Sequence, residues 1–330
     1  MNRREFLVRS SLLASAGVMA RSSLLSQTPA PAATPPPAAL PPQAAITEFR
    51  ALRRGVGIFT GRGGTIGWLS AKDALVVVDT QFPDTAAICL AGLPDRGTRM
   101  IDVVINTHHH ADHTSGNGIF KPAARTIVAQ ANVPKLMFDA AERAAKAEKP
   151  GAAGSGGPDM SKQTFPDTTF TDVWRRDFGD EIVTAQYFGP AHTKGDVAIM
   201  FEKANVVHCG DLVFNRLYPV IDRPGGASIH GWIARLEEIV KTYPADAIYV
   251  AGHGSKKFGV TASRGELLVL RDYFSALLDY TQKQITAGKS KAEIATLENF
   301  PGFEDFHMPR PNRLGQNLSV AYDELTESKA

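Results

Sequence analysis

The chain has 330 residues, of which 43% are hydrophobic and 21% charged, as in an ordinary globular protein with one large domain or two small ones. Its formal net charge is +2, and the excess lies in residues 1–20, which hold three arginines and one glutamate; 33 basic and 33 acidic residues remain in the rest. We therefore expect no nucleic-acid partner, because the basic footprint that such binding needs is missing.

Residues 1–20 have the pattern of an export signal. The pair Arg3-Arg4 precedes an apolar stretch, Ser11–Ala20, that ends in small residues suited to cleavage. This stretch is too short to be a stable membrane anchor, so we expect none. The pattern resembles twin-arginine signals, which implies the twin-arginine export machinery as a partner. We therefore expect a periplasmic protein.

The rest of the chain is predicted to be a linker followed by one layered domain. Residues 21–46, rich in Ala, Pro, Ser and Gln, are interpreted as a disordered linker, and the domain is predicted over residues 47–330 with a C-terminal helical extension. Short β-rich runs alternate there with helical or loop stretches, which favours an α/β fold. The predicted strands are Ile66–Leu69, Leu75–Asp79, Val103–Thr107, Thr126–Ala129, Ile182–Phe188, Val197–Phe201, Val206–Gly210 and Ile248–Ala251. The predicted helices are Lys135–Glu148, Ile233–Lys241 and Arg264–Ala287, with a glycine-rich loop at Gly151–Pro158.

Four histidines and one aspartate lie within six residues at the end of a predicted strand. They are His108, His109, His110, Asp112 and His113. Imidazole and carboxylate groups are ligands that zinc and its first-row neighbours accept. In an extended backbone alternate side chains share a face, so His108 and His110 can reach one metal ion while His109 points away. The chain must then turn, and Asp112 and His113 can reach a second ion.

Three later strands also lead into residues that can bind a metal. These residues are His192, Asp211 and His253. Loops at strand ends are where α/β folds place functional sites. Taken alone, each of the three is a weak signal: His192 fits a hydrogen-bonded loop residue better than a ligand, Asp211 fits a turn or cap residue as well, and His253 fits a turn residue equally well. Together with the histidine cluster they supply five histidines and two aspartates, enough for two metal ions and an open position for water.

Four segments resemble the metallo-β-lactamase superfamily, in the order that the family has. They are Thr107–His113, Gly189–Thr193, Cys209–Asp211 and Ala251–Gly254, and Leu75–Asp79 resembles the family's early strand that ends in a supporting aspartate. The resemblance spans about residues 50–255. It implies a four-layer αββα sandwich with a dinuclear zinc site at one edge of the two sheets.

The resemblance also implies a role for each site residue. His108, His110 and His192 resemble the ligands of the first zinc ion. Asp112, His113 and His253 resemble those of the second, and Asp211 resembles the carboxylate that bridges the two. His109 lies at the variable position and receives no role. Iron and manganese are the alternatives to zinc.

This site predicts a zinc-dependent hydrolase. Two divalent ions that share a water can hold it as hydroxide near neutral pH, with Asp112 as the catalytic residue that orients it. The predicted target is an acyl-type bond of a small molecule: a β-lactam, lactone, ester or thioester. The alternatives are a phosphodiesterase of the same fold and a non-hydrolytic iron-binding redox protein.

Among the candidate substrates, Asp211 counts against a β-lactam. Within the family that this chain resembles, zinc β-lactamases lack the bridging aspartate and carry a cysteine or serine near that strand end. Cys209 lies two residues before Asp211, so it does not restore the β-lactamase pattern. No feature of the sequence indicates an oligomeric state.

Several residues near the ligands are candidates for the substrate pocket. Four aromatic residues are hypothesised to form an apolar wall: Trp68, Phe214, Tyr218 and Trp232. His230 fits a pocket residue and a capping or packing residue equally well.

Overall fold

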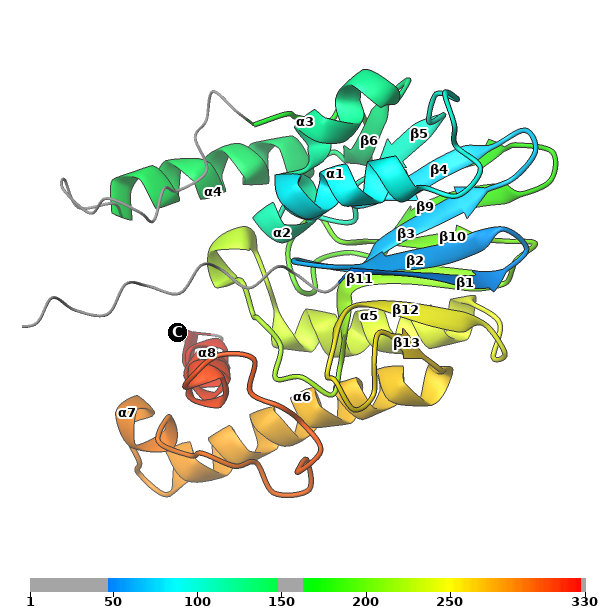
Figure 1. Ribbon diagram of the computed structural model, residues 1–330. Helices are drawn as coiled ribbons and strands as arrows, with labels where there is room; N and C mark the ends of the chain where they lie inside the picture. The colour runs from blue at the N-terminus through cyan, green and yellow to red at the C-terminus, as the bar shows by residue number, and fades with distance from the viewer. Residues whose placement is uncertain (1–46, 148–162, 328–330) are drawn as a thin grey trace, which may run out of the picture. The chain divides into compact units, whose positions relative to one another are not determined.

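The computed structural model describes residues 47–147 and 163–327 (Figure 1). The expected export signal, the linker and the glycine-rich loop at Gly151–Pro158 lie outside the described residues. Among the helices in the described ranges, none is both long and apolar enough to cross a membrane.

The first sheet has seven strands that follow one another in chain order. They are β1 (Glu48–Arg53), β2 (Val56–Thr60), β3 (Ile66–Ser70), β4 (Leu75–Val78), β5 (Val103–Ile105), β6 (Ile127–Gln130) and β7 (Thr168–Phe170). Strands β1 to β4 pair antiparallel, and β4 to β7 pair parallel. All residues of β4, β5 and β6 are buried, as expected of parallel strands that are covered on both faces.

The second sheet has six strands in the order β13-β12-β11-β10-β9-β8. They are β8 (Val173–Asp177), β9 (Ile182–Tyr187), β10 (Val197–Phe201), β11 (Val206–Asn215), β12 (Ile248–Gly254) and β13 (Thr261–Ala262). Neighbouring strands are antiparallel except β11 and β12, which run parallel.

The helices connect and cover these sheets. They are α1 (Pro83–Gly92), α2 (Ala111–Thr114), α3 (Asn117–Phe120), α4 (Val133–Ala147), α5 (Ile229–Thr242), α6 (Arg264–Thr286), α7 (Lys291–Ile294) and α8 (Arg313–Glu327). Short 3-10 turns follow α3 at Lys121–Ala123 and precede α5 at Arg223–Gly225.

Three apolar clusters separate four layers, which Figure 1 shows as two sheets with helices outside each. Between the sheets, Val76 and Val78 of β4 pack in one cluster with Ile199 of β10. On the outer face of the first sheet, Val77 packs with residues of α1 and α3, because successive side chains of a strand point to opposite faces. Residues of α5, α6 and α8 cover the second sheet, where Trp232 is fully buried. The expected αββα sandwich is confirmed.

Each predicted strand and helix is present, with some bounds corrected. The prediction ended β11 at Gly210 and placed Asp211 in the next loop; instead β11 continues to Asn215 beside β12, with shifts of register on both sides of Gly210. Helix α5 begins four residues earlier than predicted, because the Ser228 side chain caps it by accepting a hydrogen bond from Gly231 N.

Strands β1, β2, β7, β8 and β13 and helices α1, α2 and α3 were not among the predicted elements, while α7 and α8 lie in the expected C-terminal helical extension, for which no bounds were predicted. Edge strands β1 and β8 are largely exposed, so they lack the apolar alternation on which the prediction depended.

Candidate metal centre

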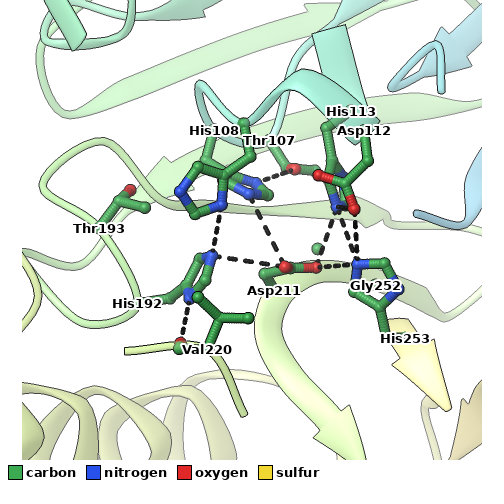
Figure 2. A network of polar contacts seen from close by, with 12 residues as sticks. Thr107, His108, Asp112, His113, His192, Thr193, Asp211, Val220, Gly252 and His253 are labelled. Carbon is green, nitrogen blue, oxygen red and sulfur yellow. Dashed lines mark hydrogen bonds and ion pairs between the residues drawn. The ribbon is translucent and has the colours of Figure 1, made fainter. Parts of the chain in front are cut away.

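The seven predicted ligands lie together at one edge of the two sheets. The segment after β5 and helix α2 supplies four of them, the loop after β9 supplies His192, and β11 and β12 supply Asp211 and His253. Figure 2 shows Asp211 between His192 and His253, with His108, Asp112 and His113 facing it from the first sheet.

The first half of the centre consists of His108, His110, His192 and Asp211, each of which has one ligand atom within 4.8 Å of the others. His192 Nε2 lies 2.9 Å from His110 Nδ1 and 3.4 Å from Asp211 Oδ2. His108 Nε2 lies 3.8 Å from the same oxygen. Three imidazole nitrogens and one carboxylate oxygen thus converge on one point.

The second half consists of Asp112, His113 and His253. His253 Nε2 lies 3.1 Å from Asp112 Oδ2 and 3.4 Å from His113 Nε2. The other oxygen of Asp211, Oδ1, lies 3.1 Å from His113 Nε2 and 3.4 Å from His253 Nε2. Asp211 therefore turns one carboxylate oxygen to each half.

The donor atoms fit metal ions better than they fit one another. His108 Nε2 and Asp211 Oδ1 are buried, and neither has a partner in hydrogen-bonding geometry among the described residues. Burying such atoms without a partner costs free energy, so native proteins rarely do it. Within each half, one pair of imidazole nitrogens also faces each other: His110 with His192, and His113 with His253. A cation in each half would satisfy all of these atoms, and the mixture of imidazole and carboxylate suits zinc, iron or manganese.

Charge in the centre favours the same conclusion. Burial lowers the pKa of His192 to about 3, so its ring is neutral, which is the form that binds a metal. Burial would also lower the pKa of His113, but the carboxylates of Asp211 and Asp79 raise it well above its usual value. The second half thus attracts positive charge, which a divalent cation would supply.

Two glycines allow the close approach that the site needs. A Cβ atom on Gly64 would lie 2.1 Å from the His113 ring, and one on Gly252 would lie 2.0 Å from Asp211 Oδ1. Neither position accepts a side chain while the ligands keep their places.

Asp79 holds His113 in place from behind. It is fully buried at the end of β4, and its Oδ2 accepts a hydrogen bond from His113 Nδ1 at 2.7 Å. Thr107 donates to Asp79 from its backbone N and its Oγ1, both at 2.7 Å. The carboxylate accepts the hydrogen bond of the Nδ1–H group and leaves Nε2 directed at the second half.

Two residues that were not predicted from the sequence contact the histidines of the first half. His192 Nδ1 lies 2.9 Å from the Val220 carbonyl, and His110 Nε2 lies 2.9 Å from Asp222 Oδ2. Both residues lie in the connection from β11 to α5, where no ligand-like spacing marks them. His109 points away from Asp211, and its Nε2 lies 3.5 Å from the same Asp222 oxygen.

The hypothesised aromatic wall is wrong, because all four of its members are buried in the core. Trp68 packs on the opposite face of the first sheet, and Tyr218 is buried against Tyr273 and Phe306. The other two, Phe214 and Trp232, are buried and support the ligands from the core. The Phe214 ring stacks on His253 at 5.4 Å, and the Trp232 ring lies 5.3 Å from His192.

His230 packs against Glu324 of α8, in agreement with the packing alternative, while the cap of α5 is Ser228. Its Nδ1 lies 2.8 Å from Glu324 Oε1 at the start of α5. A cavity of about 460 Å³ does lie beside the second half, and its lining includes Arg50, Gly64, His253 and Lys256.

Comparison with known proteins assigns the family. The model of the metallo-beta-lactamase superfamily matches residues 59–253. A probable metallo-hydrolase of Methanocaldococcus jannaschii, MJ0888, is 26% identical over 54% of this chain and 82% of its own length. A hydroxyacylglutathione hydrolase of Methylococcus capsulatus is 28% identical over 56% of this chain, and the match spans 61% of that enzyme.

Solved structures share the fold at low identity. The sec-alkylsulfatase Pisa1 from Pseudomonas sp. superposes with a TM-score of 0.62 at 16% identity, over 84% of this chain and 50% of that one. A metallo-beta-lactamase from Pontibacter korlensis superposes with a TM-score of 0.54 at 16% identity, over 70% of this chain and 99% of that one. The family match contains all seven predicted ligands, and the chain belongs to the metallo-β-lactamase superfamily.

Proposed function

We propose that this protein is a two-metal hydrolase, with zinc as its metal, that cleaves an acyl-type bond of a small molecule. The observation that carries the proposal is Asp211, whose Oδ2 faces His108 and His192 while its Oδ1 faces His113 and His253. A carboxylate shared in this way fits two cations held side by side, as in hydrolases that use a two-metal site.

Two such cations, when bound, lower the pKa of a shared water and polarise the bond that it attacks. Substrate reaches the centre from the side of Asp112 and His253, whose side chains are 30% and 25% exposed, whereas His113 is fully buried. Burial alone would raise the pKa of Asp112, but His113 and His253 hold it well below its usual range. The Asp112 carboxylate is therefore ionised and can orient the attacking water by accepting a hydrogen bond from it.

The chemistry needs no covalent intermediate on the chain. Cys209, the cysteine nearest to Asp211 in the sequence, is 1% exposed and packs in the core between the second sheet and its helices. Burial raises the pKa of its thiol, so it stays protonated and unreactive. We assign it a packing role only.

An acyl substrate is favoured by one relative. The Methylococcus enzyme, by its name, hydrolyses a hydroxyacyl derivative of glutathione, which is an acyl-type substrate. The balanced charge of residues 21–330 supports a small molecule over a nucleic acid. Thioesters and lactones are accordingly the first substrates to test, ahead of β-lactams.

The test is a hydrolysis panel on zinc-loaded protein: a thioester, a lactone, a chromogenic cephalosporin and a bis-aryl phosphate. We expect turnover of the thioester or the lactone that a chelator abolishes and added zinc restores. The variant Asp112→Asn should lose most of this rate, while Asp180→Asn on a distant exposed turn should keep it. Turnover of the phosphate alone would replace the acyl assignment with a phosphodiesterase. Bound iron with a redox spectrum and no turnover would overturn the hydrolase proposal.

We also propose that the chain is exported to the periplasm through the twin-arginine machinery. The support is the Arg3-Arg4 pair and the apolar stretch Ser11–Ala20. Replacing both arginines with lysine should leave the protein in the cytoplasmic fraction of its bacterial host. Unchanged periplasmic recovery of this double variant would refute the route.

A further inference from the structure

The connection from β11 to α5 contacts two histidines of the first half, His110 and His192. It reaches the ring nitrogen of each that faces away from the other ligands. A carbonyl and a carboxylate can only accept, so His192 donates its Nδ1 proton to Val220 and His110 donates its Nε2 proton to Asp222, both at 2.9 Å. The two histidines therefore present opposite ring nitrogens to the metal, Nε2 of His192 and Nδ1 of His110. A single stretch of three residues sets both tautomers.

The position of Asp222 is fixed by hydrogen bonds and by close packing against Gly225. Its Oδ1 accepts a hydrogen bond from Gly225 N at 3.1 Å, and its backbone oxygen accepts one from Ala227 N at 3.0 Å. A Cβ on Gly225 would lie 2.0 Å from Asp222 Oδ2 and 3.0 Å from the His109 ring. The carboxylate thus sits between the turn and the two adjacent histidines, and it is directed at His110.

The C-terminal segment holds this connection at both ends. At its start, Tyr218 N donates to the His307 carbonyl at 3.0 Å. At its end, Arg223 forms an ion pair with Glu327 of α8 and lies 3.8 Å from Glu324 Oε2. These C-terminal residues lie outside the part of the chain that the family model matches.

Glu324 makes this contact a buried one. Its side chain is 10% exposed and accepts hydrogen bonds from Ile229 N at 2.8 Å and from Ser228 Oγ at 3.0 Å, at the start of α5. The connection is therefore fixed between helix α5 and helix α8, directly behind the first half of the centre.

We propose that Asp222 is a positioning residue of the first half and that residues 307–327 hold it in place through Arg223 and Glu324. The C-terminal extension is then a structural support of the metal centre. This inference rests on the proposed two-metal centre, and the test below separates the failure of one from the failure of the other.

The first experiment compares Asp222→Asn with Asp246→Asn, an exposed carboxylate in the loop before β12. The asparagine keeps the size of the side chain but loses its charge. We expect one of the two metal affinities, that of the first half, to fall by about 10–100-fold in Asp222→Asn, which is the usual effect of losing a partner of a ligating histidine. Competition titration with a chelating dye measures both affinities, and cobalt(II) substitution reports the geometry of the first half. Asp246→Asn should match the wild type in both.

The second experiment uses Arg223→Gln, which removes the ion pair with α8 but leaves Asp222 unchanged. It should weaken the same metal site and change the same cobalt bands, by a smaller factor than Asp222→Asn. Thermal unfolding of the metal-free proteins serves as the check on folding.

Three results decide the matter. A wild-type protein that binds fewer than two metals overturns the proposed function, whatever the variants do. If the wild type binds two metals and Asp222→Asn keeps both affinities and the wild-type cobalt spectrum, the positioning role is wrong. A variant that weakens both metals equally and also melts earlier without metal shows a general role in folding, and this too overturns the inference.

Discussion

Replacing Gly64 with alanine should remove the second half of the metal centre. A methyl carbon at this position would lie 2.1 Å from His113 Cε1 and 2.3 Å from its Nε2. Ordinary contact begins at 3.4 Å, so the ring or the loop must move by about 1.3 Å, the difference between 3.4 Å and 2.1 Å.

His113 has little freedom to make that movement. Its Nδ1 is bonded to Asp79 at 2.7 Å, its Nε2 lies 3.1 Å from Asp211 Oδ1, and its side chain is fully buried. Metal–ligand distances tolerate about 0.2 Å, so a shift of this size should weaken the second metal by about 100-fold or more. Overpacking a buried site also costs on the order of 1–3 kcal/mol, which should appear in the free energy of unfolding of the metal-free protein.

Elemental analysis after dialysis gives the number of metals per chain, and urea unfolding gives the stability. We expect about one metal in Gly64→Ala and two in the wild type. The matched control is Gly265→Ala in α6, where the added carbon lies 3.4 Å from Ser263 Oγ and meets no backbone strain. That control should bind two metals and unfold at least as late as the wild type, because alanine favours a helix by up to about 1 kcal/mol. Two metals at wild-type affinity in Gly64→Ala would refute the reasoning.

Three further predictions test the bridge, the core and the thiols. Asp211→Ala should bind fewer than two metals, because each half loses an oxygen that it shares; two retained metals would show that the bridge is misassigned. Burial lowers the pKa of His208 to about 4, so the unfolded chain takes up its proton first and stability falls as the pH drops from 6.5 toward 4. Between pH 6.5 and 5, metal-free His208→Gln should lose about 1.6 kcal/mol less than the wild type in urea unfolding, and equal losses would contradict this. Burial raises the pKa of both thiols, Cys89 and Cys209, so iodoacetamide at pH 8 should modify neither until urea is added, and mass spectrometry of the folded protein would expose an error.

The donor residues could be named in advance because their signals are local. His108 to His113 form one short run, and each of the later three comes directly after a predicted strand or a few residues beyond it. Strand ends are where α/β folds place their sites, so these residues were expected to lie at one edge. The prediction of an α/β fold succeeded because β4, β5, β6, β10 and β11 are buried throughout and so are marked by apolar runs, whereas the αββα layers were expected only from the family resemblance.

The position of Asp211 within β11 was harder to predict from the sequence. The prediction ended β11 at Gly210, where the apolar run stops. The strand continues because β12 pairs with it beyond that point, and Gly210 has a φ of 51° that turns the chain against Thr107. Pairing of this kind depends on a neighbour some forty residues away, and apolar periodicity within one segment does not report it.

By itself, the sequence determined the chemical types of the donors, the strand ends that carry them and the family's fold. Only the tertiary structure decided how those donors are oriented. Asp222 lies 112 residues from His110 in the chain, and Val220 lies 28 residues from His192, yet each accepts a hydrogen bond from its histidine. Such contacts come from packing between segments that are distant in the chain. Here helix α8 contacts the segment that holds both acceptors. Contacts of this kind produce no periodic pattern in the sequence. The physical reason is that ligand type is a property of single residues, whereas ligand orientation is a property of the packed chain.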